Sequence, residues 1–556
     1  MSLTVEGDSQ QTVSFPPSLP QDGVQRFRVT LETAGARAGT DQAVPGRRLA
    51  RAMAVRARRH WLLLIALTAG LGLRVATQLA YRPALLYIDS AKYLTTGLEK
   101  SDPQGYRDLV LKPLLWVGNL AVVTGFQHLL GLAMAVALYA TLIRRHAPRW
   151  AATLAAAPLL LDAYQLQMEQ TIMPDVTFEA LITTGLVILL WKPRPTVNAL
   201  ALGGFALGLS ATVRQVGEVL IVPAVAVCLL SARGWRARLS GGGLLTASFA
   251  IPVLVYMTYS AVILHDRFEL SDQGDAVLYG RVAAAADCPA LRIPAAMRPL
   301  CPSPQVARSF GVDGLVNNQT SPAYTTAPAA GLSRAAAAKR FSYAVLEQQP
   351  LRVAGAIARD AVKLFALTRN TAPGDTPIWR WQFQVTYPAY PPTITLSSAA
   401  ALFRSAGGGG APAAVRPLAD SLRDYQLHGG YTPGPYLLLA LLAGVGGVAT
   451  GWVRRDVRAA LACLLMTGAG AAVLLGADLY EFSWRYQLPA LVTLPAAGAL
   501  GAAAVQGWIR DPARRKTAAT SAPDPAVTLG RCPASASSLT SGPWSPASST
   551  RIRGSG

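Results

Sequence analysis

Residues 125–143, GFQHLLGLAMAVALYATLI, form an uninterrupted apolar run that ends at Arg144 and Arg145. A helix of about this length rises about 30 Å, which matches the hydrocarbon core of a bilayer. Runs of the same kind recur along the chain, with charges mostly confined to their ends, and 51% of the 556 residues are hydrophobic. We therefore predict an all-α polytopic membrane protein with about ten transmembrane helices. The ten predicted spans are 61–79, 125–143, 150–168, 174–191, 197–213, 216–231, 243–264, 434–452, 457–477 and 485–508.

Lysine and arginine residues gather in alternate connectors, which predicts the orientation of the spans. The basic connectors lie before residue 61, near 146, 193, 235 and 455, and after 509, whereas the turn at 169–173 has no basic residue. Both termini are thus expected in the cytoplasm, and the chain in the plasma membrane. The apolar segment 109–124 would invert everything after it if it crossed the bilayer, so we interpret it as an outer-surface or re-entrant segment.

The two tails, 1–60 and 509–556, are rich in Ser, Pro and Arg and are expected to be disordered cytoplasmic segments. Much of the net charge of +21 lies in these tails and in the cytoplasmic connectors. There it sets topology and contacts anionic lipid. The sequence contains no basic folded module, so nucleic acid is not an expected partner.

The membrane core divides into 61–265, with seven spans and an outer loop at 80–124, and 434–508, with three spans. Between them lies a segment, 266–433, that we expect to be extracytoplasmic and α+β. In this segment Ser333 is expected to cap a helix that runs to about Gln349, and a second helix follows Pro350. Residues 379–387 alternate as on one face of a strand, which indicates the core side of a small sheet, or alternatively a platform for sugar rings.

Cysteine usage indicates one disulfide. Cys288 and Cys301 close the short stretch DCPALRIPAAMRPLC outside the cytoplasm, where a disulfide is favoured and unpaired thiols are the alternative. The five histidines are scattered along the chain and form no group with ligand spacing, so no metal site is predicted.

Five ionisable residues are expected at the outer membrane boundary, where charges are costly and often functional. They are Asp89, Glu169, Asp175, Arg214 and Arg485. Asp162 and Glu169 are expected on one face of a helix, and Asp175 and Glu179 on one face of the next. The alternative is that such residues only secure helix ends, and in particular that Asp89 caps a helix beginning at Ser90.

The order of these residues resembles the C-type glycosyltransferase superfamily, which includes protein O-mannosyltransferases and the lipid A aminoarabinose transferase. The resemblance rests on Asp89 in the first outer loop, the stretch from Glu169 to Asp175, the turn 212–217 and the start of the last span at Arg485. It covers about 60–230 and 480–505.

The resemblance implies transfer of a sugar from a polyprenyl-phosphate donor to a glycan, lipid or protein hydroxyl outside the cell, with inversion. It assigns the general base to Asp89 and the phosphate clamp to Arg214 and Arg485. Glu169 and Asp175 would orient the sugar or the acceptor. Where the family often has two adjacent acids, Asp89 is followed by Ser90, so a bound divalent cation is not expected and no cofactor is required. The alternative function is a transporter or flippase of lipid-linked glycans.

Overall fold

The computed structural model describes residue 55 and the ranges 57–95, 102–232, 234–265, 267–328, 331–391 and 393–509. The two predicted tails fall almost entirely outside these residues. Contacts divide the chain into a unit that ends at Trp61 and a unit that begins at Leu62. Nearly all of the described residues, and every feature of the cavity below, belong to the second unit.

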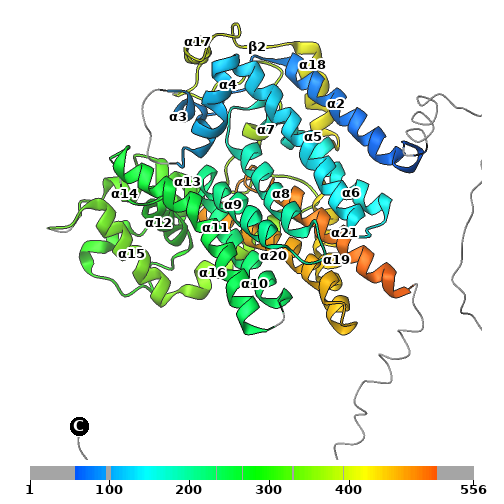
Figure 1. Ribbon diagram of the computed structural model, residues 1–556. Coiled ribbons are helices and arrows are strands. Elements are labelled where there is room, and N and C mark those ends of the chain that lie inside the picture. The colour runs from blue at the N-terminus through cyan, green and yellow to red at the C-terminus, as the bar shows by residue number, and fades with distance from the viewer. Residues whose placement is uncertain are drawn as a thin grey trace, which may run out of the picture. The chain divides into compact units, whose positions relative to one another are not determined.

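Six helices in the described residues are long and apolar enough to cross a membrane (Figure 1). They are α2 (Trp61–Ala80), α5 (Leu120–Arg144), α11 (Trp235–Val262), α19 (Gly434–Val453), α20 (Val457–Tyr480) and α21 (Ala490–Ile509). The membrane character of the chain follows from these helices. The remaining predicted spans coincide with shorter helices: α6 (Arg149–Leu161), α7 (Ala163–Gln170), α8 (Asp175–Leu190), α9 (Val197–Val213), η2 (Gln215–Leu220) and α10 (Ile221–Ser231).

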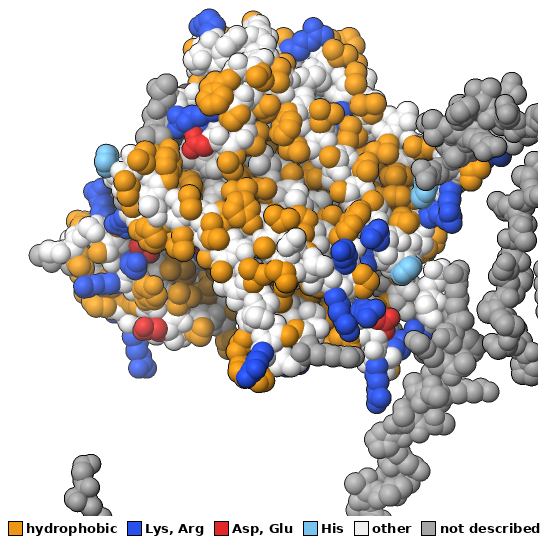
Figure 2. Space-filling view, in the orientation of Figure 1, with side chains coloured by type: hydrophobic (Ala, Val, Ile, Leu, Met, Phe, Trp, Pro, Cys, Tyr) orange, Lys and Arg blue, Asp and Glu red, His pale blue; other side chains and the backbone are white. Residues whose placement is uncertain are grey.

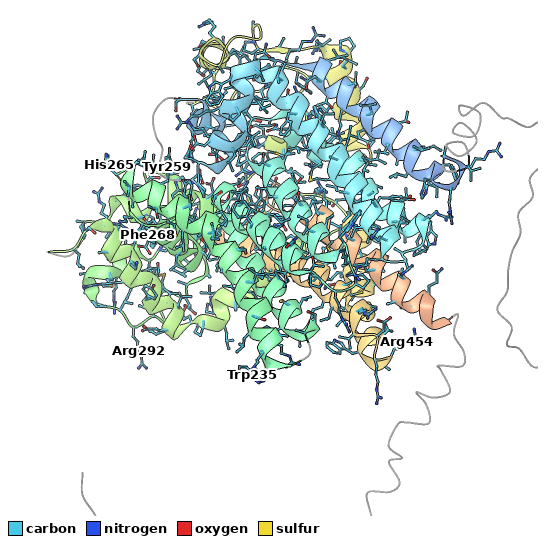
Figure 3. All side chains as sticks on the ribbon, in the orientation of Figure 1. Trp235, Tyr259, His265, Phe268, Arg292 and Arg454 are labelled. Carbon is cyan, nitrogen blue, oxygen red and sulfur yellow. A yellow bond between two sulfur atoms is a disulfide. The ribbon has the colours of Figure 1, made fainter. Side chains whose placement is uncertain are left out.

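The long apolar helices expose large apolar side chains on the outside of the molecule, as a lipid-facing surface would. Leu71, Val75 and Leu79 of α2 are exposed, as are Leu254 and Val255 of α11. Orange hydrophobic side chains cover much of the visible face, whereas Lys and Arg lie mostly toward its margins (Figure 2). Trp235, at the start of α11, and Arg454, in the α19–α20 connector, lie toward the lower edge of the view, as does Arg292, while Tyr259 near the other end of α11 lies at the upper left (Figure 3).

The predicted span 150–168 is not one continuous helix. It breaks at Asp162, where an extended backbone (φ −69°, ψ 121°) separates α6 from α7. The Asp162 carboxylate caps α7 by accepting from the Tyr164 amide, and it also accepts from the Thr432 amide at 2.7 Å and pairs with Arg369 at 3.0 Å. Asp162 and Glu169 therefore do not share the face of one helix, because the side chain of Asp162 ends one helix and begins the next.

The segment 109–124 does not form a span of its own. A π-helical turn, η1 (Arg107–Leu111), leads into the short helix α4 (Lys112–Val117), and α5 then begins at Leu120. Trp116 and Val117 are 82% and 77% exposed. These exposures agree with the interpretation of 109–124 as a surface segment that does not cross the membrane.

The segment 266–433 is helical and has a small core of its own. Its helices are α12 (Gly274–Ala285), η3 (Ala295–Leu300), α13 (Pro304–Asn317), α14 (Pro322–Thr325), α15 (Arg334–Gln348), α16 (Pro350–Lys363), η4 (Ile378–Trp381), α17 (Leu396–Ser405) and α18 (Arg416–Leu427). Tyr279, Leu315, Phe341 and Val345 are buried together in its core. The predicted disulfide between Cys288 and Cys301 is confirmed.

Two predicted helices of this segment are confirmed and the predicted strand is wrong. The Ser333 hydroxyl accepts from the Ala336 amide and caps α15, and α16 begins at Pro350. Residues 379–387 instead contain most of the 3₁₀ turn η4, followed by irregular chain. Of the aromatic row, Trp381, Phe383 and Tyr387 are buried, whereas Trp379 is exposed. Among the described residues the named strands are β1 (Tyr81–Arg82) and β2 (Ala413–Ala414), which pair antiparallel.

Candidate functional site

A cavity of about 540 Å³ lies where five parts of the chain meet. These are the loop that leads into the short helix α3 (Ser90–Leu94), the start of α8, the α9–η2 turn, the α20–α21 turn, and the segment 266–433. Four of the five predicted functional residues line the cavity: Asp89, Asp175, Arg214 and Arg485. They are distant in the sequence, so it is the fold that brings the acids and the guanidiniums together.

Asp89 is held by two cations. Its Oδ2 lies 3.2 Å from Nη1 of Arg485, and its Oδ1 lies 3.3 Å from Nζ of Lys92, which also pairs with Asp102 at 2.8 Å. Burial raises the pKa of Asp89, but the charges of Arg485 and Lys92 outweigh this effect and bring the pKa below its ordinary value of 3.8. The carboxylate is therefore ionised at neutral pH and able to accept a proton.

Asp89 does not act as a helix cap through its side chain. It occupies the N-cap position of α3, but its backbone is in the helical region and its carboxylate accepts no capping hydrogen bond. A capping aspartate accepts from an amide of the first turn. The alternative interpretation, in which Asp89 caps the helix that begins at Ser90, is therefore supported by no hydrogen bond.

Asp175 and Arg214 form a second ion pair in the cavity. Asp175 follows Pro174 as the first residue of α8, and its Oδ1 accepts from Nη1 of Arg214 and lies 3.7 Å from Nε of Arg485. Its other oxygen, Oδ2, is buried and has no hydrogen-bond partner among the described residues. Arg485 therefore stands between the two carboxylates.

The turn that presents Arg214 depends on a close approach of backbone. Arg214 ends α9 in an extended conformation, and η2 begins at the next residue. A Cβ on Gly217 would lie 2.7 Å from the Ala211 amide nitrogen, so only glycine fits there without a shift of the turn. This packing places Arg214 at the cavity wall.

Aromatic rings fix the orientation of both guanidiniums. The Arg485 guanidinium carbon lies 4.6, 5.1 and 5.6 Å from the ring centroids of Tyr486, Trp381 and Tyr87, and that of Arg214 lies 4.7 Å from Tyr486. Stacked arginines keep their planar donors aligned for an anion with two oxygens. Trp381 comes from the row that the sequence assigned to a strand, so part of that row lines the cavity.

The sequence reasoning missed an acid in the cavity, Glu481. It lies in the turn between α20 and α21, shortly before Arg485 in the sequence, and it lines the cavity. Burial raises the pKa of Glu481 to about 8, as does the charge of Asp313, while Arg485 and a hydrogen bond with Tyr486 oppose the shift. The available signal was its position between two predicted spans, where an acidic residue is often functional. Lys92 was missed in the same way, three residues after Asp89.

Glu169 does not line the cavity. It is fully buried between α2, α5 and α7, where Oε1 pairs with Arg74 at 2.7 Å and Oε2 lies 2.8 Å from Nδ1 of His128. Arg74 also donates to the carbonyls of Leu159 and Leu160, which precede the break at Asp162. Through these contacts Glu169 connects α7 with α2 and α5.

The described residues contain no group of three or more His, Cys, Asp or Glu side chains placed to hold a metal ion. No protein-family model matches the chain, and no curated protein matches it significantly. A functional argument therefore rests on the chemistry of the cavity.

Proposed function

We propose that the protein is a membrane glycosyltransferase that moves a sugar from a polyprenyl-phosphate donor to an extracytoplasmic hydroxyl. The observation that carries the proposal is one cavity at the ends of apolar helices that contains an ionised carboxylate, Asp89, and two stacked arginines, Arg214 and Arg485. Its volume of about 540 Å³ lies in the usual range for ligand sites, about 300–1,000 Å³.

The chemistry requires a base and a phosphate site. The acceptor oxygen attacks the anomeric carbon as the bond from that carbon to the phosphate oxygen breaks, and the phosphate leaves with the electron pair. Asp89 accepts the proton of the acceptor hydroxyl, and Arg214 and Arg485 stabilise the charge that grows on the phosphate. A single displacement inverts the anomeric centre.

Donor binding would also prepare the base. Arg485 pairs with Asp89, and a phosphate bound in the cavity would compete for the same guanidinium. As the phosphate takes over Arg485, Asp89 loses the charge that lowers its pKa and becomes a stronger base. Glu169 has no part in this scheme, and Asp175 positions Arg214.

The competing function is a transporter or flippase of lipid-linked glycans. The break between α6 and α7, with the buried acids Asp162 at the break and Glu169 on α7, is the feature that favours it, because transporters often bind substrate at broken helices. These two acids are paired, whereas Asp175, which has an oxygen without a hydrogen-bond partner among the described residues, lines the cavity. We therefore favour the transferase.

The test compares cell-envelope glycans among a deletion strain, the strain complemented with the wild type, and the strain complemented with Asp89→Asn. The transferase predicts a sugar that is missing from both the deletion and the Asp89→Asn strains. An unchanged glycan profile accompanied by lost uptake would favour the transporter.

The proposal places the protein in the plasma membrane with cytoplasmic termini and an outward-facing cavity, as the basic connectors indicate. Residue 193, between α8 and α9, is then cytoplasmic. A cysteine at that position that reacts with an impermeant reagent in intact cells would reverse the orientation and remove the cavity from the outer face.

A further inference from the structure

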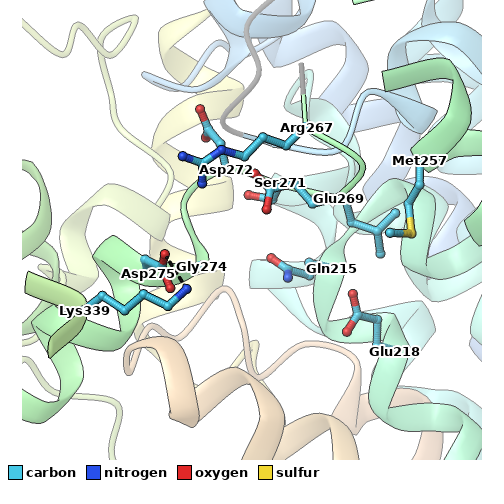
Figure 4. Close-up of a pocket in the computed structure, with 11 residues that line it drawn as sticks. Gln215, Glu218, Met257, Arg267, Glu269, Ser271, Asp272, Gly274, Asp275 and Lys339 are labelled. Atoms are coloured by element: carbon cyan, nitrogen blue, oxygen red, sulfur yellow. Dashed lines mark hydrogen bonds and ion pairs between the residues drawn. The ribbon is translucent and has the colours of Figure 1, made fainter. Parts of the chain in front are cut away.

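A second, smaller cavity adjoins the one that holds Asp89. We call it the side cavity; its volume is about 280 Å³. It lies between η2 and α11 on one side and the loop 267–273 with the first turn of α12 on the other, with Lys339 of α15 at its edge. Figure 4 shows the polar side chains of Gln215, Asp272, Asp275 and Lys339 around one common space.

The two cavities share part of their walls. Gln215 and Ser271 line both of them. Gln215 directly follows Arg214, whose guanidinium holds Asp175 in the main cavity. A molecule in the side cavity is therefore adjacent to the proposed phosphate site.

The lining of the side cavity is polar and carries an excess of negative charge. Met257 and Leu270 are its large apolar members. Its charged members are Glu218, Glu269, Asp272, Asp275, Arg267 and Lys339, which are four acids and two bases. Lys339 pairs with Asp275 at 3.0 Å, and the buried Oε1 of Glu269 has no hydrogen-bond partner among the described residues.

This lining excludes two parts of the donor. A polyprenyl chain would strip water from charged side chains without replacing their hydrogen bonds. A phosphate would meet a surplus of carboxylates, whereas the main cavity offers it two stacked arginines. The remaining reactant of the proposed reaction is the acceptor, whose hydroxyl groups donate hydrogen bonds to carboxylate and amide oxygens.

We propose that the side cavity is the acceptor subsite and that it binds a glycan without net negative charge, whose hydroxyl reaches Asp89 past Gln215 and Ser271. The inference rests on the proposed transferase function. A glycan fits better than a peptide, because most of the side chains around the cavity are charged or carry amide or hydroxyl groups that hydrogen-bond to sugar hydroxyls, and Met257 and Leu270 are its large apolar members.

Gly274 offers a site for a reporter. It lines the side cavity, its φ is not in the left-handed region, and a Cβ built on it meets no atom within 4 Å. Gly274→Cys, in a Cys532→Ser background, therefore places a thiol in open space; Cys228 and Cys463 are buried. Ser397→Cys, on the exposed face of α17, is the reference. The full-length protein is purified in detergent, and the rate of thiol modification is measured with a small impermeant reagent.

The probes are a panel of neutral oligosaccharides, the same panel after sulfation, and a Ser/Thr peptide of similar length. Substrate KM values are typically at most about 1 mM, so a bound neutral oligosaccharide at about 10 mM should slow modification of Gly274→Cys about tenfold. Sulfated oligosaccharides and the peptide should leave the rate unchanged, and Ser397→Cys should be unaffected throughout. Equal protection by sulfated sugars, protection by the peptide alone, or no protection by any neutral member overturns the proposal.

A second measurement links the subsite to transfer. In native membranes, Gly274→Trp should lower sugar transfer to the endogenous acceptor at least about tenfold by filling the subsite, whereas Ser397→Trp, on the exposed face of α17 and outside both cavities, should transfer normally. Normal transfer by Gly274→Trp overturns the subsite while leaving the transferase intact. Failure of the transferase itself is recognised separately, by a deletion strain whose cell-envelope glycans are unchanged. The protection experiment needs no activity, so its outcome does not depend on that result.

Discussion

Replacing Asp89 by asparagine removes one proton acceptor from the cavity with little other change. Asparagine keeps the size of the side chain and can still accept a hydrogen bond through its amide oxygen. Neither cation is left alone: Lys92 retains Asp102 at 2.8 Å, and Arg485 retains Asp175 at 3.7 Å and its aromatic neighbours. Because the Asp89 side chain is 24% exposed, we expect a loss of only about 1 kcal/mol in the free energy of unfolding.

The effect on transfer should be far larger. A positioned general base contributes about 10²- to 10⁴-fold, or about 3–5 kcal/mol of barrier at about 1.4 kcal/mol per tenfold. We expect Asp89→Asn to lower kcat by at least about a hundredfold while donor binding changes little. The assay measures single-turnover transfer from the lipid-linked donor in proteoliposomes, together with donor binding at equilibrium.

The pH dependence gives an independent readout. Only the ionised carboxylate accepts a proton, so transfer falls as the pH drops through the pKa of Asp89. In the free protein that pKa lies below 3.8, so the acid limb of kcat/KM should lie below about pH 4. In the donor complex the phosphate competes for Arg485, so the acid limb of kcat should lie at higher pH. The residual transfer rate of Asp89→Asn should not fall at low pH in either kcat/KM or kcat, because the variant has no carboxylate to protonate at this position.

Asp102→Asn is the matched control. It removes a carboxylate from the same lysine, with a similar exposed fraction of 35%, but leaves the proposed base in place. It should retain more than about a tenth of the wild-type rate, since it removes one partly exposed ion pair. Near wild-type turnover in Asp89→Asn, or an equal loss in both variants, would refute the assignment of Asp89 as the base.

Further variants probe the surroundings of the base. Arg214→Ala should raise the KM for the donor at least about tenfold and more than Arg214→Lys does, because a guanidinium holds two phosphate oxygens; unchanged transfer at limiting donor would reduce Arg214 to a packing residue. Glu169→Gln should destabilise the fold by about 3 kcal/mol, measured by thermal unfolding in detergent, and leave the donor KM unchanged, since it breaks a buried ion pair outside the cavity. Glu481→Gln should be more stable than the wild type at pH 8, and the difference should vanish near pH 4.5. The pKa of Glu481 is raised to about 8 in the folded protein, so the wild type loses stability as the unfolded chain ionises between those values, by about 1.4 kcal/mol per pKa unit at most. A constant difference across this pH range would contradict that pKa. Reducing the Cys288–Cys301 disulfide should cost about 2–4 kcal/mol without altering donor binding, as followed by thermal unfolding and equilibrium binding.

The sequence predicted the apolar helices well because a bilayer imposes a minimum length and excludes charge from the middle of a span. It also predicted four residues of the cavity, since charges at helix ends can be located once the spans are known. It failed at Asp162, where the hydropathy of 150–168 continues through a break that is stabilised by Arg369, a residue two hundred positions away. No local pattern encodes that partner.

The same limitation applies to Glu169 and to residues 379–387. Glu169 occupies the helix end that the sequence indicated, but its partners, Arg74 and His128, face it from two other helices. The alternation of residues 379–387 reflects burial against Tyr81 and Tyr87, whose rings stack on Phe383 and contact Trp381. Trp381, Phe383 and Tyr387 are buried as the alternation predicted, but Trp379 is 49% exposed and the strand is wrong. Burial of alternate residues also arises in an irregular chain that packs against neighbouring side chains.

The ion pair between Arg369 and Asp162 has a consequence for how the segment 266–433 moves. Asp162 is 2% exposed and lies at the break between α6 and α7, and Arg369 reaches it from this segment, which lines one side of the cavity. Lifting that segment away at this edge would leave a carboxylate without its counter-ion in an apolar surrounding, at a cost of about 3–5 kcal/mol. At that cost the detached arrangement would make up less than about 1% of the molecules at equilibrium. We therefore expect this contact to stay closed and to act as a fixed pivot for any motion of the covering segment.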